Sequence, residues 1–211
     1  MGKRKIDYTL YLVTDRDVLK GRNLEKAVED AILGGTTLIQ LREKNATSLE
    51  FYNIATNIKK ITDKYSVPLI INDRIDIALA VDAAGVHIGQ SDLNCAVVRR
   101  ILPKDKIIGV SAHNLEEGIQ AQKDGADYLG CGAMFNTSTK KDASLVDIDT
   151  LKEIKRKINI PVVAIGGIDI NNVSEFEGTY IDGISVVSAI LGKENSKISA
   201  KELKEKFENL K

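Results

Sequence analysis

The chain of 211 residues has few of the residues that form disulfides or bind structural metals, with two cysteines and two histidines. Cys95 and Cys131 are far apart and neither belongs to a CxxC pair, so a disulfide framework is excluded and reduced thiols are expected. We predict that Cys95 opens a helix and that Cys131 ends a strand. His87 and His113 lack an HExxH-like spacing, so the sequence offers no zinc site.

An excess of charge is also absent, because 30 basic side chains balance 30 acidic ones. No overall field attracts nucleic acid or an anionic membrane, and any preference for anions must be local. No apolar run approaches the roughly 18 residues of a membrane span. No apolar stretch follows the charged residues 1–7, so a signal peptide is not expected. These absences predict a cytoplasmic protein.

Linkers rich in proline or serine are absent too, which predicts a single domain over residues 1–211. The chain instead has short apolar runs separated by amphipathic segments. The runs cover residues 10–13, 37–40, 69–71, 86–88, 107–110, 128–130, 162–165 and 183–186. They do not alternate with polar residues, which is typical of parallel strands buried on both faces. They predict an α/β fold, a (β/α)8 TIM barrel, since residues 13–16 lack the GxGxxG of an open dinucleotide-binding sheet.

Amphipathic patterns and caps predict the helices. Helical spacing covers residues 24–33, 48–65, 151–158 and 200–210, with a shorter segment at 75–81. Thr47 or Ser48 should cap one helix, and Asn114 should cap another with Glu117 in a capping-box position. Glycines 34–35, 85 and 125 should end helices in a left-handed conformation. Residues 133–147 are polar and without periodicity, which indicates a long loop that acts as a lid.

Polar side chains follow three predicted strands where each one ends. Asp73 follows residues 69–72, Asp92 follows residues 85–91, and residues 40–44 read Gln-Leu-Arg-Glu-Lys. The carboxyl ends of barrel strands meet at one mouth, so these turns should lie together. Carboxylates suit Mg²⁺, and Arg42 and Lys44 suit phosphate oxygens. A helix cap at residues 72–73 and a solvated loop at 42–44 are the simpler alternatives.

A second anionic place is expected after the last two strands. Residues 166–167 are Gly-Gly and residues 185–188 close the eighth run, in the region where barrels often bind a monophosphate. Hydroxyls and cations at residues 137–141 could cover a bound phosphate, although that segment taken alone is better interpreted as a plain polar loop. Two phosphorylated substrates joined with loss of diphosphate is the simplest reaction that uses both places.

Three other polar residues have a structural alternative. Ser111, at the end of the fifth run, suits a phosphate oxygen or the cap of the next helix. His113 has no evident partner, which argues against a role as an acid or base. His87 lies between apolar residues and is expected to be a packed, hydrogen-bonded histidine.

Motifs along nearly the whole chain, from residue 10 to about residue 192, together resemble the thiamine-phosphate synthase family. They lie at residues 11–14, 40–44, 71–73, 85–92, 109–113, 137–140, 165–168 and 186–190. The resemblance implies a (β/α)8 barrel and a Mg²⁺-dependent transferase of thiamine biosynthesis. Such an enzyme couples hydroxymethylpyrimidine diphosphate to thiazole phosphate and releases diphosphate. The pyrimidine ionises first in this family, so neither a nucleophile nor a base is required.

The resemblance also implies the role of each site residue. Mg²⁺ would be bound by Asp73 and Asp92. The pyrimidine diphosphate would be bound by Gln40, Leu41, Arg42, Glu43, Lys44, Asn72, Ser111 and Lys140, with Gln40 at the ring and Arg42, Lys44 and Lys140 catalytic. The thiazole phosphate would be bound by Thr137, Ser138, Thr139, Gly167, Val187 and Ser188. Ala133 and Asn136 stand where the family commonly has prolines, which predicts a more mobile lid.

Three alternatives belong to other classes of barrel. A thiazole tautomerase or a non-catalytic regulatory barrel would not be expected to keep the whole set of metal and diphosphate residues present here. A sugar-phosphate isomerase would need a convincing pair of bases. The partners expected are therefore two phosphorylated small molecules, with no nucleic acid and no membrane, and a homo-oligomer is compatible with the resemblance.

Overall fold

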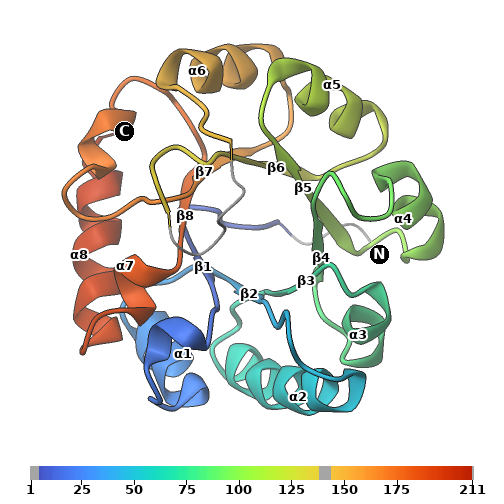
Figure 1. The fold of residues 1–211 in the computed structure, drawn as a ribbon, viewed down its shortest axis with the longest axis vertical. Coiled ribbons are helices and arrows are strands. Elements are labelled where there is room, and N and C mark those ends of the chain that lie inside the picture. The colour runs from blue at the N-terminus through green and yellow to red at the C-terminus, as the bar shows by residue number, and fades with distance from the viewer. Residues whose placement is uncertain (1–4, 138–143, 211) are drawn as a thin grey trace.

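The structure is a computed structural model that describes residues 5–137 and 144–210. It confirms the predicted barrel, because the strands pair in parallel in sequence order and β8 closes on β1 (Figure 1). The strands are β1 (Leu10–Val13), β2 (Leu38–Leu41), β3 (Leu69–Asn72), β4 (Gly85–Ile88), β5 (Ile107–Ala112), β6 (Tyr128–Cys131), β7 (Val162–Ile165) and β8 (Gly183–Val186).

Helices form the outer ring around these strands (Figure 1). They are α1 (Leu24–Leu33), α2 (Ser48–Lys64), α3 (Ile75–Ala80), α4 (Cys95–Ile101), α5 (Leu115–Lys123), α6 (Ile148–Lys157), α7 (Ser188–Leu191) and α8 (Ser196–Glu208), with short 3₁₀ helices η1 (Asp17–Leu19) and η2 (Val173–Phe176). Cys95 opens α4 and Cys131 ends β6, as predicted, and both side chains are buried. No described helix is long and apolar enough to cross a bilayer.

Apolar side chains on both faces of the strands build two separate cores. The larger core packs the barrel wall against the ring of helices. The smaller one fills the barrel interior and consists of Tyr8, Tyr11, Leu38, Ile70, Ile107, Tyr128 and Val163. Tyr8 precedes β1 and packs on Tyr128 with ring centroids 4.9 Å apart. The amino-terminal end of the barrel is therefore filled, and polar side chains gather at the other end.

Most predicted helix starts are confirmed, and their caps explain the differences. Thr47 caps α2 in a complete capping box with Glu50. Asn114 caps α5 by accepting a hydrogen bond from the Glu117 amide. The helices predicted at 151–158 and 200–210 begin earlier, at residues 148 and 196, because the side chains of Asp147 and Asn195 cap them.

The predicted glycine caps are confirmed in part. Gly35 and Gly125 have φ of +104° and +93°, whereas Gly34 is right-handed, with φ of −85°. The prediction for Gly85 is wrong, because this residue lies inside β4, where a Cβ would collide with the Ile107 carbonyl of β5. Asp82 instead takes the left-handed conformation after α3, with φ of 51°. Aspartate tolerates that region better than most side chains, so the turn needs no glycine.

The long loop after β6 is bonded to the barrel at its base. The Met134 amide donates to the Ile165 carbonyl at 3.0 Å, and the Val146 amide donates to the Ala133 carbonyl at 2.8 Å. The first arm of the loop is thus bonded to β7, and the second arm is bonded to the first. The predicted site residues Ser138, Thr139 and Lys140 lie outside the described residues.

Candidate active site

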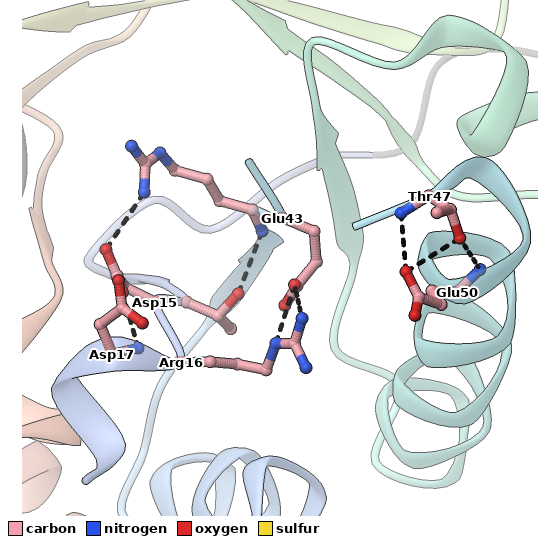
Figure 2. A network of polar contacts seen from close by, with 8 residues as sticks. Asp15, Arg16, Asp17, Glu43, Thr47 and Glu50 are labelled. Carbon is pink, nitrogen blue, oxygen red and sulfur yellow. Dashed lines mark hydrogen bonds and ion pairs between the residues drawn. The ribbon is translucent and has the colours of Figure 1, made fainter. Parts of the chain in front are cut away.

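Arg42 is the first charged side chain after β2, and two residues from the end of β1 hold it. Its backbone amide donates to the Thr14 hydroxyl at 3.0 Å, and its guanidinium donates to the Asp15 carboxylate at 3.1 Å (Figure 2). The Arg42 side chain is only 20% exposed. Asp15 was not singled out by the sequence analysis, because it becomes a partner of Arg42 only when β1 and β2 pair.

Glu43 has a different environment from Arg42. Its carboxylate accepts hydrogen bonds from the Arg16 guanidinium at 2.8 and 2.7 Å, and Figure 2 shows the two side chains facing each other. The Glu43 side chain is 4% exposed, and burial raises the pKa of its carboxyl. A carboxylate repels a phosphate, so any contact of Glu43 with a diphosphate would come from its backbone.

The two aspartates singled out in the sequence lie together. Lys44 donates to the Asp73 carboxylate at 2.5 Å, and the Gly89 amide donates to the Asp92 carboxylate at 2.7 Å. Burial raises the pKa of the Asp92 carboxyl, the nearby Asp73 carboxylate raises it further, and Lys44 and the Gly89 amide oppose the shift. Carboxylates from two successive β/α units thus share one place at the barrel mouth.

The backbone around Asp73 excludes the simpler alternative of a helix cap. The N-cap position of α3 is Arg74, and no side chain caps that helix. Asp73 instead adopts a left-handed conformation with φ of 58°, and its amide donates to the His87 carbonyl at 2.9 Å. The carboxylate is therefore turned to Lys44 and Asp92 rather than to the start of α3.

Asp73 and Asp92 fit a magnesium ion. The described residues contain no cluster of three or more His, Cys, Asp and Glu side chains that could enclose a metal. Mg²⁺ does not need such a cage, because it commonly takes one or two protein carboxylates and completes its shell with water and substrate phosphates. The repulsion between the two carboxylates is the kind that a hard cation relieves. The donor set therefore favours Mg²⁺ over zinc.

Gln40 and Ser111 lie on the inner wall of the barrel. The Gln40 amide nitrogen donates to the Tyr11 hydroxyl at 2.6 Å, and the Ser111 hydroxyl lies 3.0 Å from Nε2 of His87. The prediction that His87 is packed and hydrogen-bonded is confirmed, and Ser111 does not cap α5. Tyr11 and Tyr128 were missed as polar groups, because each lies within an apolar run of the sequence.

His113 has a partner, so the expectation that it lacks one is wrong. Its Nδ1 lies 2.9 Å from the Glu117 carboxylate, which also accepts from the His113 backbone amide at 2.8 Å. The pair could have been predicted from the sequence, because residues four apart at the start of a helix lie close together.

The opposite side of the mouth is made largely of backbone. Gly166 and Gly167 follow β7 with φ of +100° and +65°, and a Cβ on Gly167 would lie 2.6 Å from the Asn136 carbonyl. Val187 follows β8 as the N-cap residue of α7, and Ser188 opens α7. The loops that follow β6 and β7 therefore come close together, and β8 pairs with β7 beside them, as a ligand held by backbone groups requires.

The fold and the site define a class, a (β/α)8-barrel enzyme with carboxylates, cations and an amide at the carboxyl ends of its strands. Residues 10–190 match the family model described as thiamine monophosphate synthase. The chain therefore belongs to the thiamine monophosphate synthase family, and it is an enzyme of the transferase class.

Individual relatives agree with the family model. The chain is 63% identical over 203 residues to a thiamine-phosphate synthase of Clostridium tetani, which covers 96% of this chain and 97% of the relative. It is 60% identical over 208 residues to one of Clostridium botulinum, with 99% and 98% covered. A solved structure of thiamine phosphate pyrophosphorylase from Pyrococcus furiosus is 40% identical and superposes with a TM-score of 0.90 over 97% of both chains.

Proposed function

We propose that this enzyme couples 4-amino-2-methyl-5-(diphosphooxymethyl)pyrimidine with 4-methyl-5-(2-phosphooxyethyl)thiazole to give thiamine monophosphate and diphosphate. The observation that carries the proposal is the meeting of Asp73 and Asp92 beside Lys44 at the mouth, with Arg42 in the same turn as Lys44. This set suits a metal-bound diphosphate. The relatives named above support the same reaction.

The reaction breaks the bond between the pyrimidine methylene carbon and the diphosphate oxygen, which keeps the electron pair. The methylene carbon then forms a bond with the thiazole nitrogen, and the positive charge ends on the thiazolium ring. No proton is transferred, so no general base is needed. The protein must stabilise negative charge on the leaving group, which preorganised cations and hydrogen-bond donors do well.

Side chains from successive turns share this task in the proposal. Arg42, Lys44 and Lys140 bind the diphosphate as cations, while Asn72 and Ser111 add hydrogen bonds and the backbone of residues 41 and 43 lines the site. Gln40 orients the pyrimidine ring. Bound Mg²⁺, held by Asp73 and Asp92, would supply further positive charge to the diphosphate oxygens.

The thiazole phosphate belongs on the other side of the mouth. Its proposed ligands are the loop residues Thr137, Ser138 and Thr139 and the backbone of Gly167, Val187 and Ser188. The hydroxyl of Ser185 in β8 is buried and has no hydrogen-bond partner within the described ranges, so it offers a further polar group. Zero net charge fits substrates that are small anions rather than nucleic acid, and we propose a cytoplasmic location.

The test is an incubation of the purified enzyme with both substrates and Mg²⁺, with thiamine monophosphate as the readout. We expect product only when both substrates are present and expect EDTA to stop the reaction. Failure to form product in saturating Mg²⁺ would contradict the proposal. Conversion of a thiazole phosphate between tautomers, without coupling, would favour a tautomerase.

A further inference from the structure

An unbroken series of hydrogen bonds crosses the barrel interior from Gln40 to Ser111. Gln40 Nε2 lies 2.6 Å from the Tyr11 hydroxyl, which lies 2.8 Å from the Tyr128 hydroxyl. That second hydroxyl lies 2.9 Å from His87 Nδ1, and His87 Nε2 lies 3.0 Å from the Ser111 hydroxyl. We call these five residues the interior relay. It links two strands that carry proposed substrate ligands, β2 and β5.

The barrel wall is shaped around the rings of the relay. Tyr128 is fully buried, and His87 is 8% exposed. Gly109 pairs with both of these residues in the strand register, and a Cβ there would collide with the Tyr128 ring. A Cβ on Gly130 would come within 3.0 Å of the His87 ring. Two glycines inside strands therefore leave room for the rings that carry the relay.

The relay has a direction that follows from the Gln40 amide. An amide nitrogen donates and cannot accept, so the Tyr11 oxygen accepts from it. The opposite direction would leave the hydrogen of the buried Tyr11 hydroxyl without an acceptor in the relay, so we infer that Tyr11 donates it to Tyr128. The Tyr128 hydroxyl in turn donates to Nδ1 of His87. Burial raises the pKa of both phenols, so both keep their protons. With Nδ1 accepting, His87 carries its proton on Nε2 and donates to the Ser111 oxygen.

We propose that Tyr11, Tyr128 and His87 are positioning residues that fix how Gln40 and Ser111 meet the substrate. The relay engages the Gln40 nitrogen and leaves its oxygen to accept from the pyrimidine amino group. It engages the Ser111 oxygen as an acceptor and turns the serine proton toward the diphosphate. This inference rests on the proposed function and deepens it.

The same direction excludes a second chemistry for the serine and histidine pair. A nucleophilic serine needs a histidine nitrogen with a free lone pair to take its proton. His87 Nε2 already bears hydrogen in the relay, and the group behind Nδ1 is a neutral phenol rather than a carboxylate. Ser111 is therefore a hydrogen-bond donor to the leaving group and not a nucleophile.

The central test replaces Tyr128 by Phe, which removes one oxygen and breaks the relay on both sides. We expect kcat for coupling to fall about tenfold to a hundredfold, as for other supporting hydrogen-bond partners, with KM for the thiazole phosphate unchanged. Tyr8→Phe is the matched control, because Tyr8 packs on Tyr128 in the same core but is not a member of the relay. Tyr8→Phe should keep wild-type kcat.

A double variant separates positioning from a general loss of packing. If Tyr128 acts through Ser111, adding Tyr128→Phe to Ser111→Ala should cost clearly less than the same change costs in the wild type. Equal losses in the two backgrounds, or equal kcat for Tyr128→Phe and Tyr8→Phe, would overturn the positioning role.

The histidine tautomer gives a readout that is independent of activity. The chain has two histidines, so ¹⁵N spectra of the ligand-free protein can be assigned with a His113→Gln variant. We expect His87 to show a protonated Nε2 and an accepting Nδ1 in the wild type and in Tyr8→Phe, and to lose this preference in Tyr128→Phe. A wild-type His87 protonated on Nδ1 would overturn the direction of the relay. If the wild type makes no thiamine monophosphate, the proposed function fails, whereas the tautomer result stands by itself.

Discussion

The two sides of the barrel mouth present their polar groups in different ways. At the ends of β2 to β5 the groups are side chains. Arg42 and Asp73 are each held by a partner from a neighbouring turn, and Asp92 is held by the Gly89 amide of its own turn. At the ends of β6 and β7 the loops approach one another closely, and glycines such as Gly167 allow the contact. On the side of β2 to β5, activity should therefore be lost when a side chain is removed. On the other side, it should be lost when a side chain is added.

The largest effect is expected from Asp73→Ala, on the side of the mouth where side chains provide the polar groups. Loss of this carboxylate removes a proposed magnesium ligand and the partner of Lys44, so coupling should fall by about a hundredfold or more. The measurement is kcat/KM in saturating Mg²⁺, with melting temperature as the check on folding. Asp76→Ala is the matched control, because this aspartate is exposed in the first turn of α3 and pairs with Arg74. Near-full activity of the Asp73 variant would remove the basis of the metal site.

The backbone half is tested by Gly167→Ala. The new Cβ would meet the Asn136 carbonyl and lies on a left-handed backbone, so we expect a loss of stability of about 1–3 kcal/mol and a rise of about tenfold in KM for the thiazole phosphate. Gly178→Ala is the control, because it has φ of +70° with no atom within 4 Å of the new Cβ. It should lose about 1 kcal/mol of stability and keep its kinetics. Equal kinetic defects in the two variants would argue against a role of the β7 loop in binding.

A smaller effect is expected from Asp15→Asn, which weakens the support of Arg42. One charge-assisted hydrogen bond is worth about 1.5 kcal/mol, so KM for the pyrimidine diphosphate should rise by about tenfold at most. Steady-state kinetics with Asp17→Asn as control provides the measurement, since that aspartate opens η1 and does not pair with Arg42. A fall in KM would show that Asp15 competes with the substrate for Arg42 instead of holding it.

The smallest effect concerns pH and Asp92. Because the pKa of this carboxyl is raised, it takes up a proton at a higher pH than an ordinary aspartate, and Mg²⁺ affinity should decline correspondingly early on acidification. The half-saturating Mg²⁺ concentration, measured between about pH 5 and pH 8, should increase as the pH falls. A flat profile over this range would contradict the raised pKa.

The same shift predicts the sign of a stability change. A raised pKa in the folded state means that the ionised carboxyl disfavours folding above that pKa, so Asp92→Asn should slightly stabilise the metal-free protein at neutral pH. Asp92 as a whole is exposed and its carboxyl is only partly withdrawn from water, so the gain should stay within about 0.5 kcal/mol. Denaturant unfolding in EDTA provides the measurement.

The two sides also differ in how far the sequence reveals them. The barrel could be predicted because apolar runs mark its strands. The turns that carry Arg42, Asp73 and Asp92 could be predicted because charged side chains directly after a strand indicate a binding site. Asp15 could not, since its role exists only once β1 and β2 are neighbours. The polar role of Tyr128 could not be predicted, because this residue lies inside an apolar run. Gly85 was assigned to a helix end because the sequence does not distinguish a capping glycine from a strand glycine that packs against Ile107.

The packed amino-terminal end of the barrel determines by which end substrates and products pass. Among the described residues, Tyr8 and the aromatic and aliphatic side chains around it fill the amino-terminal end, so we expect molecules to enter and leave past the loops at the other end. In the proposed reaction, diphosphate and thiamine monophosphate would then have to leave by this end before new substrates bind. Both products should accordingly slow turnover when they accumulate.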